Sequence, residues 1–83
     1  MQISSEFPQE HLVELIGLSP NFVGRITLYR QNSGQIDAEI DIVQTESGKI
    51  YSHVKSLYNY TDPRDLLDLC VHHLKQFLES KKH

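Results

Sequence analysis

The chain has 83 residues, of which 39% are hydrophobic and 23% are charged, so its length and composition indicate one small folded domain and exclude a disordered chain. Its formal net charge of −3 argues against a general nucleic-acid binder, which neutralises phosphates with clustered cations. The single cysteine excludes an internal disulfide and suits a reducing compartment.

The predicted domain covers residues 1–83, with loose ends at 1–6 and 80–83. Residues 1–6 lack the basic and apolar regions of a secretory signal, and no segment approaches the ~18 apolar residues of a membrane span. We therefore expect a cytoplasmic location and no contact with a membrane.

A short first helix is predicted over residues 8–16. Pro8 suits the first helical position, and Gly17 and Pro20 would end the helix. Between them a stripe of apolar residues recurs at helical spacing: Leu12, Val13, Leu15 and Ile16.

Three antiparallel strands are predicted next, over residues 22–31, 35–44 and 49–57. Each alternates between apolar and polar side chains, as a sheet with one buried and one solvated face requires. Three-residue loops at 32–34 and 46–48 would join the strands, with Gly34 and Gly48 in the left-handed conformation.

These loop lengths predict the register of the sheet. A slip by one residue would bury the acidic side chains of the middle strand, so we expect the register to be firm. The expected pairs are Ile26–Ile40 and Ile40–Val54 on the buried face, and Arg25–Asp41, Asp41–His53 and Glu39–Lys55 on the outer face.

A long last helix is predicted from Asp62 onward, with Asp62 as N-cap, Pro63 at the first helical position and Asp65 at the third. The expected fold is therefore α+β in α-β-β-β-α order: a three-stranded antiparallel meander with a short N-terminal helix and a long C-terminal helix on one face. The apolar stripe that would face the sheet comprises Leu66, Leu67, Cys70, Val71, Leu74, Phe77 and Leu78.

Five histidines and a cysteine raise the question of a metal site. Cys70 and His73 lie three residues apart and could reach one metal, whereas His72 diverges from His73 by about 100° around the helix. No CxxC or HxxxH motif supplies the further ligands that zinc needs. We expect Cys70 to be a buried structural thiol, and we expect no metal and no cofactor.

On the outer face of the predicted sheet, Asp41 lies between Arg25 and His53. A histidine oriented by a carboxylate can act as a general base. However, the sequence has no nucleophile motif, and an open sheet face excludes water poorly. We therefore expect a ladder of exposed charges and no enzyme activity.

Aromatic residues mark a second candidate surface. Tyr58 and Tyr60 lie in the connector before the last helix, where they could either bind a partner or plug the end of the core. Together with the outer face of the sheet, they define the predicted partner-binding residues: Arg25, Tyr29, Asp37, Glu39, Asp41, Tyr51, His53, Tyr58 and Tyr60.

The predicted order of elements over residues 8–80 resembles the double-stranded RNA-binding domain. That family grips phosphates with a basic cluster at the start of its last helix, where this chain has Asp62, Arg64, Asp65 and Asp68. The positions that match the family's contacts on its first helix are Gln9, Glu10 and Glu14. The resemblance implies the architecture, while the residues that carry the family's function are absent.

The function that the sequence favours is protein–protein interaction, as a small regulatory or inhibitory factor similar in size and charge to acidic phage or bacterial proteins that cover a basic surface. The alternative is a nucleic-acid-binding module of the double-stranded RNA-binding type. We also expect a homodimer, formed through the edge of strand 22–31 or through apolar surface that the short first helix leaves uncovered.

Overall fold

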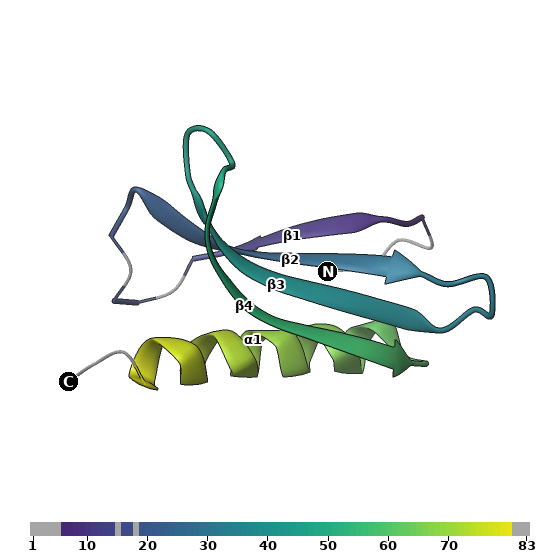
Figure 1. Ribbon diagram of the computed structural model, residues 1–83. Coiled ribbons are helices and arrows are strands. Elements are labelled where there is room, and N and C mark those ends of the chain that lie inside the picture. The colour runs from purple at the N-terminus through teal and green to yellow at the C-terminus, as the bar shows by residue number, and fades with distance from the viewer. Residues whose placement is uncertain (1–5, 15, 18, 81–83) are drawn as a thin grey trace.

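The computed structural model describes residues 6–14, 16–17 and 19–80, and it forms two layers: a sheet and one helix. The sheet is antiparallel, its strands follow one another in sequence order, and the helix lies along one face (Figure 1). The elements are β1 (Gln9–Val13), β2 (Phe22–Arg30), β3 (Ile36–Gln44), β4 (Ile50–Tyr60) and α1 (Pro63–Ser80).

The predicted α-β-β-β-α order is wrong at its first element. Residues 9–13 form strand β1, which pairs along β2 from Gln9 opposite Leu28 to Val13 opposite Gly24. The resemblance to the double-stranded RNA-binding domain therefore fails, because no first helix is present among the described residues. Leu15, part of the predicted helical stripe, lies outside the described residues, as do 1–5 and 81–83 of the predicted loose ends.

A physical reason for this difference lies in the edge of β2. A helix of about three turns has little stability of its own. As a strand, the same residues satisfy backbone groups of β2 that would otherwise form an open edge. In the strand Val13 packs against the core and its neighbour Leu12 is exposed, so the two adjacent apolar residues end on opposite faces.

The first hairpin has the predicted three-residue loop, since Gln31 donates its N–H to the carbonyl oxygen of Gln35 over 2.8 Å. The second loop is one residue longer than predicted, because Gln44 N–H donates to Lys49 over 2.9 Å and leaves residues 45–48 in the loop. The two loop glycines have positive φ angles of 91° at Gly34 and 71° at Gly48, as predicted.

The register between β2 and β3 is confirmed, with Ile26 opposite Ile40 and Arg25 opposite Asp41. Between β3 and β4 the pair Asp41–His53 is also confirmed. Beyond it, Ile40 pairs with Lys55 and Glu39 pairs with Ser56, so the predicted pairs Ile40–Val54 and Glu39–Lys55 are wrong. The reason is a β-bulge in which Val54 is the extra residue.

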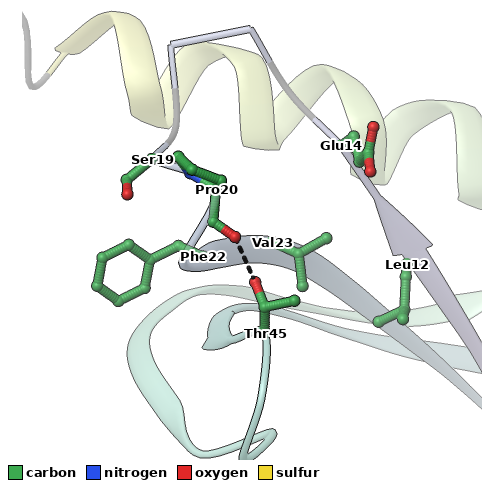
Figure 2. Close-up of a pocket in the computed structure, with 7 residues that line it drawn as sticks. All are labelled: Leu12, Glu14, Ser19, Pro20, Phe22, Val23 and Thr45. Atoms are coloured by element: carbon green, nitrogen blue, oxygen red, sulfur yellow. Dashed lines mark hydrogen bonds between the residues drawn. The ribbon is translucent and has the colours of Figure 1, made fainter.

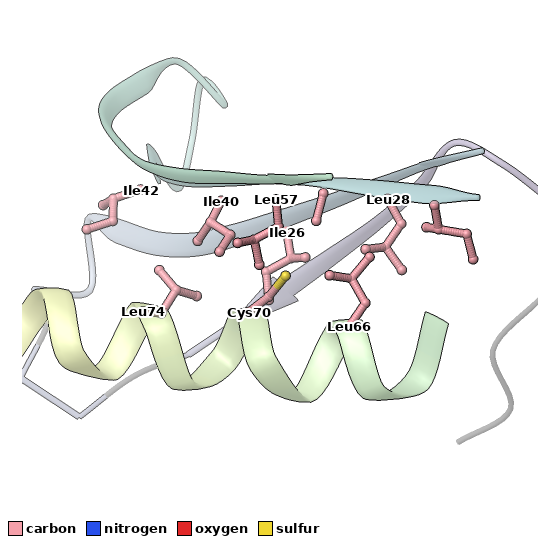
Figure 3. Packing of buried hydrophobic residues seen from close by; sticks show 10 residues of the cluster. Ile26, Leu28, Ile40, Ile42, Leu57, Leu66, Cys70 and Leu74 are labelled. Carbon is pink, nitrogen blue, oxygen red and sulfur yellow. The ribbon is translucent and has the colours of Figure 1, made fainter. Parts of the chain in front are cut away.

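The core lies between α1 and the facing side of the sheet (Figure 3). Leu66, Cys70 and Leu74 of α1 are fully buried, and the rest of the predicted stripe is partly buried against them. Asp62 caps the helix as predicted, because its Oδ1 accepts the N–H of Arg64 over 2.9 Å. The sheet contributes the remaining members of the buried cluster: Ile26, Leu28, Ile36, Ala38, Ile40, Ile42 and Leu57.

Among the described residues, no helix combines the length and the apolar character needed to cross a membrane.

Candidate functional site

The face of the sheet opposite α1, here called the outer face, is the candidate site. Figure 1 shows that α1 covers only the other face, and that the loop between β3 and β4 rises away from the helix. Strand alternation and register place three cross-strand rows on the outer face: Val23–Val43–Ile50, Arg25–Asp41–His53 and Thr27–Glu39–Ser56.

Asp41 is the centre of the outer face and is only 2% exposed. Its Oδ1 lies 2.7 Å from Nδ1 of His53, and its Oδ2 lies 3.9 Å from Nη2 of Arg25. Arg25 also donates from Nη1 to the carbonyl oxygen of Gly48 over 3.4 Å, which links the outer face to the loop between β3 and β4. The buried carboxylate therefore has a cationic partner on β2 and an imidazole partner on β4.

Ser56 extends this arrangement, since its Oγ lies 3.1 Å from Nε2 of His53. The two residues are three positions apart on one strand, and strict alternation would place them on opposite faces. The bulge at Val54 brings Ser56 to the side of His53. Sequence reasoning missed Ser56 because no local pattern in residues 49–57 marks the extra residue.

The chain Asp41–His53–Ser56 has the order of groups in which a carboxylate orients a histidine and the histidine can accept a proton from a hydroxyl. The His53 side chain is 51% exposed, so water reaches the imidazole freely. None of these three residues lines the cavity of about 600 Å³ where β1 ends and β2 begins. The hydrogen bonds among these three residues can hold the Ser56 hydroxyl and the His53 imidazole in fixed orientations.

A second polar network surrounds Asp37 near the start of β3. Its Oδ1 accepts hydrogen bonds from Nε2 of Gln31 over 2.6 Å and from the backbone N–H of Asn59 over 3.0 Å. Asn59 has a positive φ of 68°, and its side-chain oxygen accepts a further bond from Gln31. Tyr29 lies directly opposite Asp37 and is exposed, as is Tyr58, which follows the buried Leu57.

The remaining predicted residues are spread more widely. Glu39 is exposed on the outer face. Tyr51 lies at an irregularity of the β4 register, where its ring centroid is 4.5 Å from that of Phe22. Tyr60 pairs with Ile36 and is partly buried against the core, which is the plugging role left open by the sequence.

Cys70 and His73 are not brought together with further ligands, and no group of three candidate metal ligands occurs among the described residues. Burial raises the pKa of the Cys70 thiol to about 12, which keeps the thiol protonated near neutral pH. The pKa of His73 is lowered, first by burial and then by the positive charges of Lys55 and His72.

A groove opens at one corner of the outer face, where β1 ends and β2 begins (Figure 2). Thr45 bridges this corner, because its Oγ1 donates to the carbonyl oxygen of Pro20 over 2.9 Å. We call this cavity of about 600 Å³ the corner groove, and it is lined by Leu12, Glu14, Ser19, Pro20, Phe22, Val23 and Thr45.

No protein-family model matches the chain, and neither a curated protein nor a solved structure shows significant similarity to it. What the fold defines is a small α+β protein with one helix on an antiparallel four-stranded sheet.

Proposed function

We propose that this chain is a small protein-binding module that acts as a regulatory or inhibitory factor through its outer face. The observation that carries the proposal is the contrast between the two faces of the sheet. One face is sealed by α1, whereas α1 does not lie on the other, which presents ordered polar networks and exposed tyrosines. Tyrosine and arginine are the residue types enriched at protein interfaces.

Charge favours a basic partner surface. Glu10, Asp37 and Glu39 lie on the outer face, while Arg25 is engaged with Asp41. A surface with unneutralised carboxylates attracts a cationic partner and repels an acidic one. The same charge disfavours nucleic acid, and the architectural likeness that supported a nucleic-acid alternative is gone.

Local rigidity supports the same proposal. Asp37 is held by Gln31 and Asn59, and His53 is held between Asp41 and Ser56. Side chains that are ordered before binding lose less conformational entropy on association. In this proposal the Asp41–His53–Ser56 chain orders the binding surface and is not a catalytic device, and the protein works in the cytoplasm.

The test compares proteins captured by immobilised wild-type chain with those captured by Glu39→Lys. The matched control is Glu79→Lys, which makes the same charge reversal at an exposed position of α1. The proposal expects a partner that is lost with Glu39→Lys, retained with Glu79→Lys, and confirmed by calorimetry with the purified pair. Equal capture by all three chains would contradict binding at the outer face.

The non-enzymatic part of the proposal has its own test. A fluorophosphonate probe reacts covalently with serines activated by a histidine. We expect Ser56 to remain unlabelled in the folded protein, as judged by intact mass. Labelling that disappears in Ser56→Ala and in His53→Ala would show an activated nucleophile and overturn this part.

A further inference from the structure

The corner groove has a partly apolar lining. Leu12, Phe22 and Val23 contribute to this lining, and Leu12 is 62% exposed although it is a large apolar residue. Ile16, two positions after Glu14, is fully exposed. Exposed apolar side chains beside a concave surface are typical of a protein-binding site.

The borders of the groove are acidic. Glu14 lines it, and Glu46 lines an adjoining cavity of about 280 Å³ that shares Phe22 with the groove. Neither Lys nor Arg occurs among the described residues that line the two cavities. Arg25, which lies opposite Leu12, is engaged with Asp41. The two exposed carboxylates Glu14 and Glu46 therefore make this corner complementary to positive charge.

An aromatic pair lies on the same side. Phe22 lines both cavities, and its ring is in contact with the exposed ring of Tyr51. The face of a tyrosine ring attracts a lysine ammonium or an arginine guanidinium. The aromatic pair therefore adds a second reason for a cationic occupant.

Hydrogen bonds also hold one side of the groove. The backbone N–H of Thr45 donates to Asn21 over 2.8 Å, and the N–H of Phe22 donates to Ser19 over 3.0 Å. With the bond from Thr45 Oγ1 to Pro20, these contacts tie the segment before β2 to the loop after β3. A site held in this way does not need to be ordered by its ligand.

We infer that the corner groove binds a segment of a partner protein in which an apolar side chain is flanked by lysine or arginine. The apolar side chain covers Leu12 and Val23, and the cations lie beside Glu14, Glu46 and the aromatic pair. This inference rests on the proposed function and names the chemistry of the partner. A second copy docking groove to groove would oppose the same carboxylates across a two-fold axis, so a different chain is the better occupant.

The test is a titration of the isotope-labelled whole chain with a synthetic peptide, followed by amide chemical shifts. The probe has a central leucine between two valines, with two basic residues at each end. We expect shifts concentrated at Leu12, Glu14, Val23 and Thr45, and an affinity that falls with added salt. Leu12→Ser should weaken binding about tenfold, because truncating a central apolar contact has the largest effect on an interface.

Four further measurements decide the inference. Glu14→Lys should also lose binding, whereas Glu79→Lys on α1 should retain it. The same peptide with acidic ends should not bind, and circular dichroism should show that Leu12→Ser is folded. The inference is overturned by no binding of the basic peptide, by shifts confined to Arg25 and His53, or by shifts at Val23 and Thr45, away from the β1 edge, that appear on concentrating the protein alone. The first two outcomes leave the proposed function standing if the Glu39→Lys capture experiment succeeds.

Discussion

At the scale of single residues, Asp41 combines burial with charge. It is almost inaccessible to solvent although α1 does not cover its face of the sheet, and its partners come from β2 and β4. Buried carboxylates are destabilising unless they are hydrogen-bonded and paired. Asp41 on β3 therefore links β2 through Arg25 and β4 through His53.

Replacing Asp41 by alanine should lower the free energy of unfolding by about 2 kcal/mol, because Arg25 and His53 lose a charged acceptor. Urea unfolding measures the change. Glu39→Ala is the control on the same strand and should change stability by less than about 0.5 kcal/mol, since Glu39 is exposed. Equal effects of the two substitutions would contradict the central role of Asp41.

Gly24 marks a close approach between the sheet and α1. A Cβ atom at this position would lie 2.8 Å from Cδ1 of Leu74 and 3.3 Å from the carbonyl oxygen of Val13. Gly24→Ala should therefore cost about 1–3 kcal/mol through overpacking. Adding Leu74→Val should recover part of that cost. Strictly additive effects in a double-mutant cycle would show that the two residues do not compete for space.

Because of Cys70, the free energy of unfolding should fall as the pH rises into the alkaline range. Its pKa is raised from 9.0 to about 12 by burial, so above pH 9 the unfolded chain loses the thiol proton while the folded chain keeps it. Stability contributed by the neutral thiol must then fall between pH 9 and about pH 12. Cys70→Ala removes the titrating thiol. Between pH 9 and about pH 12, the free energy of unfolding measured in urea should therefore fall more for the wild type than for the variant. Parallel losses would contradict the raised pKa.

At the scale of elements, α1 depends on its contact with the sheet. Leu66, Cys70 and Leu74 are the fully buried residues of the helix and lie along one side of it (Figure 3). A helix in a small domain gains most of its stability from such packing. The sequence predicted this element correctly because capping and a long apolar stripe are both local signals.

Leu74→Ala should cost about 2–5 kcal/mol, the range for truncating a buried leucine. In a domain of this size that loss is a large part of the total stability. Gln76→Ala, at an exposed position two residues further along, is the matched control. Chemical denaturation measures both, and a loss below about 0.5 kcal/mol for Leu74→Ala would mean that the stripe does not face a packed sheet.

The bulge in β4 is a feature that the sequence did not predict. Residues 49–57 alternate regularly enough to suggest a straight strand, yet the ladder is irregular at three places along β4. Each irregularity reflects the fit of β4 to a twisted sheet and to the helix below it. The position of Ser56 beside His53 depends on this fit and could not be derived from the strand alone.

At the scale of the whole molecule, the two edges of the sheet differ. The edge of β2 through which the sequence predicted a homodimer is occupied by β1, and the short first helix on which the second predicted route depended is a strand. β4 is an irregular edge, which discourages pairing with another sheet. β1 has no second neighbouring strand within the described part of the chain.

We therefore predict that two copies of the chain associate through their sheets, by pairing their β1 edges. Sedimentation should show a species larger than a monomer at micromolar concentration that dissociates on dilution. Hydrogen exchange should then slow at β1 amides in the concentrated sample, while β4 amides serve as the internal control. A single monomeric species at all concentrations would contradict self-association and leave a different protein as the partner.

The sequence by itself determined the features whose causes lie within a few residues. These are the left-handed turn glycines, the register of β2 on β3, and the start of α1 at Asp62 and Pro63. Only the tertiary structure decided that residues 9–13 are a strand, because the free edge of β2 offers pairing that a short isolated helix cannot match. It also decided which face Ser56 occupies and where the corner groove opens, because both depend on segments far apart in the chain meeting in a twisted sheet.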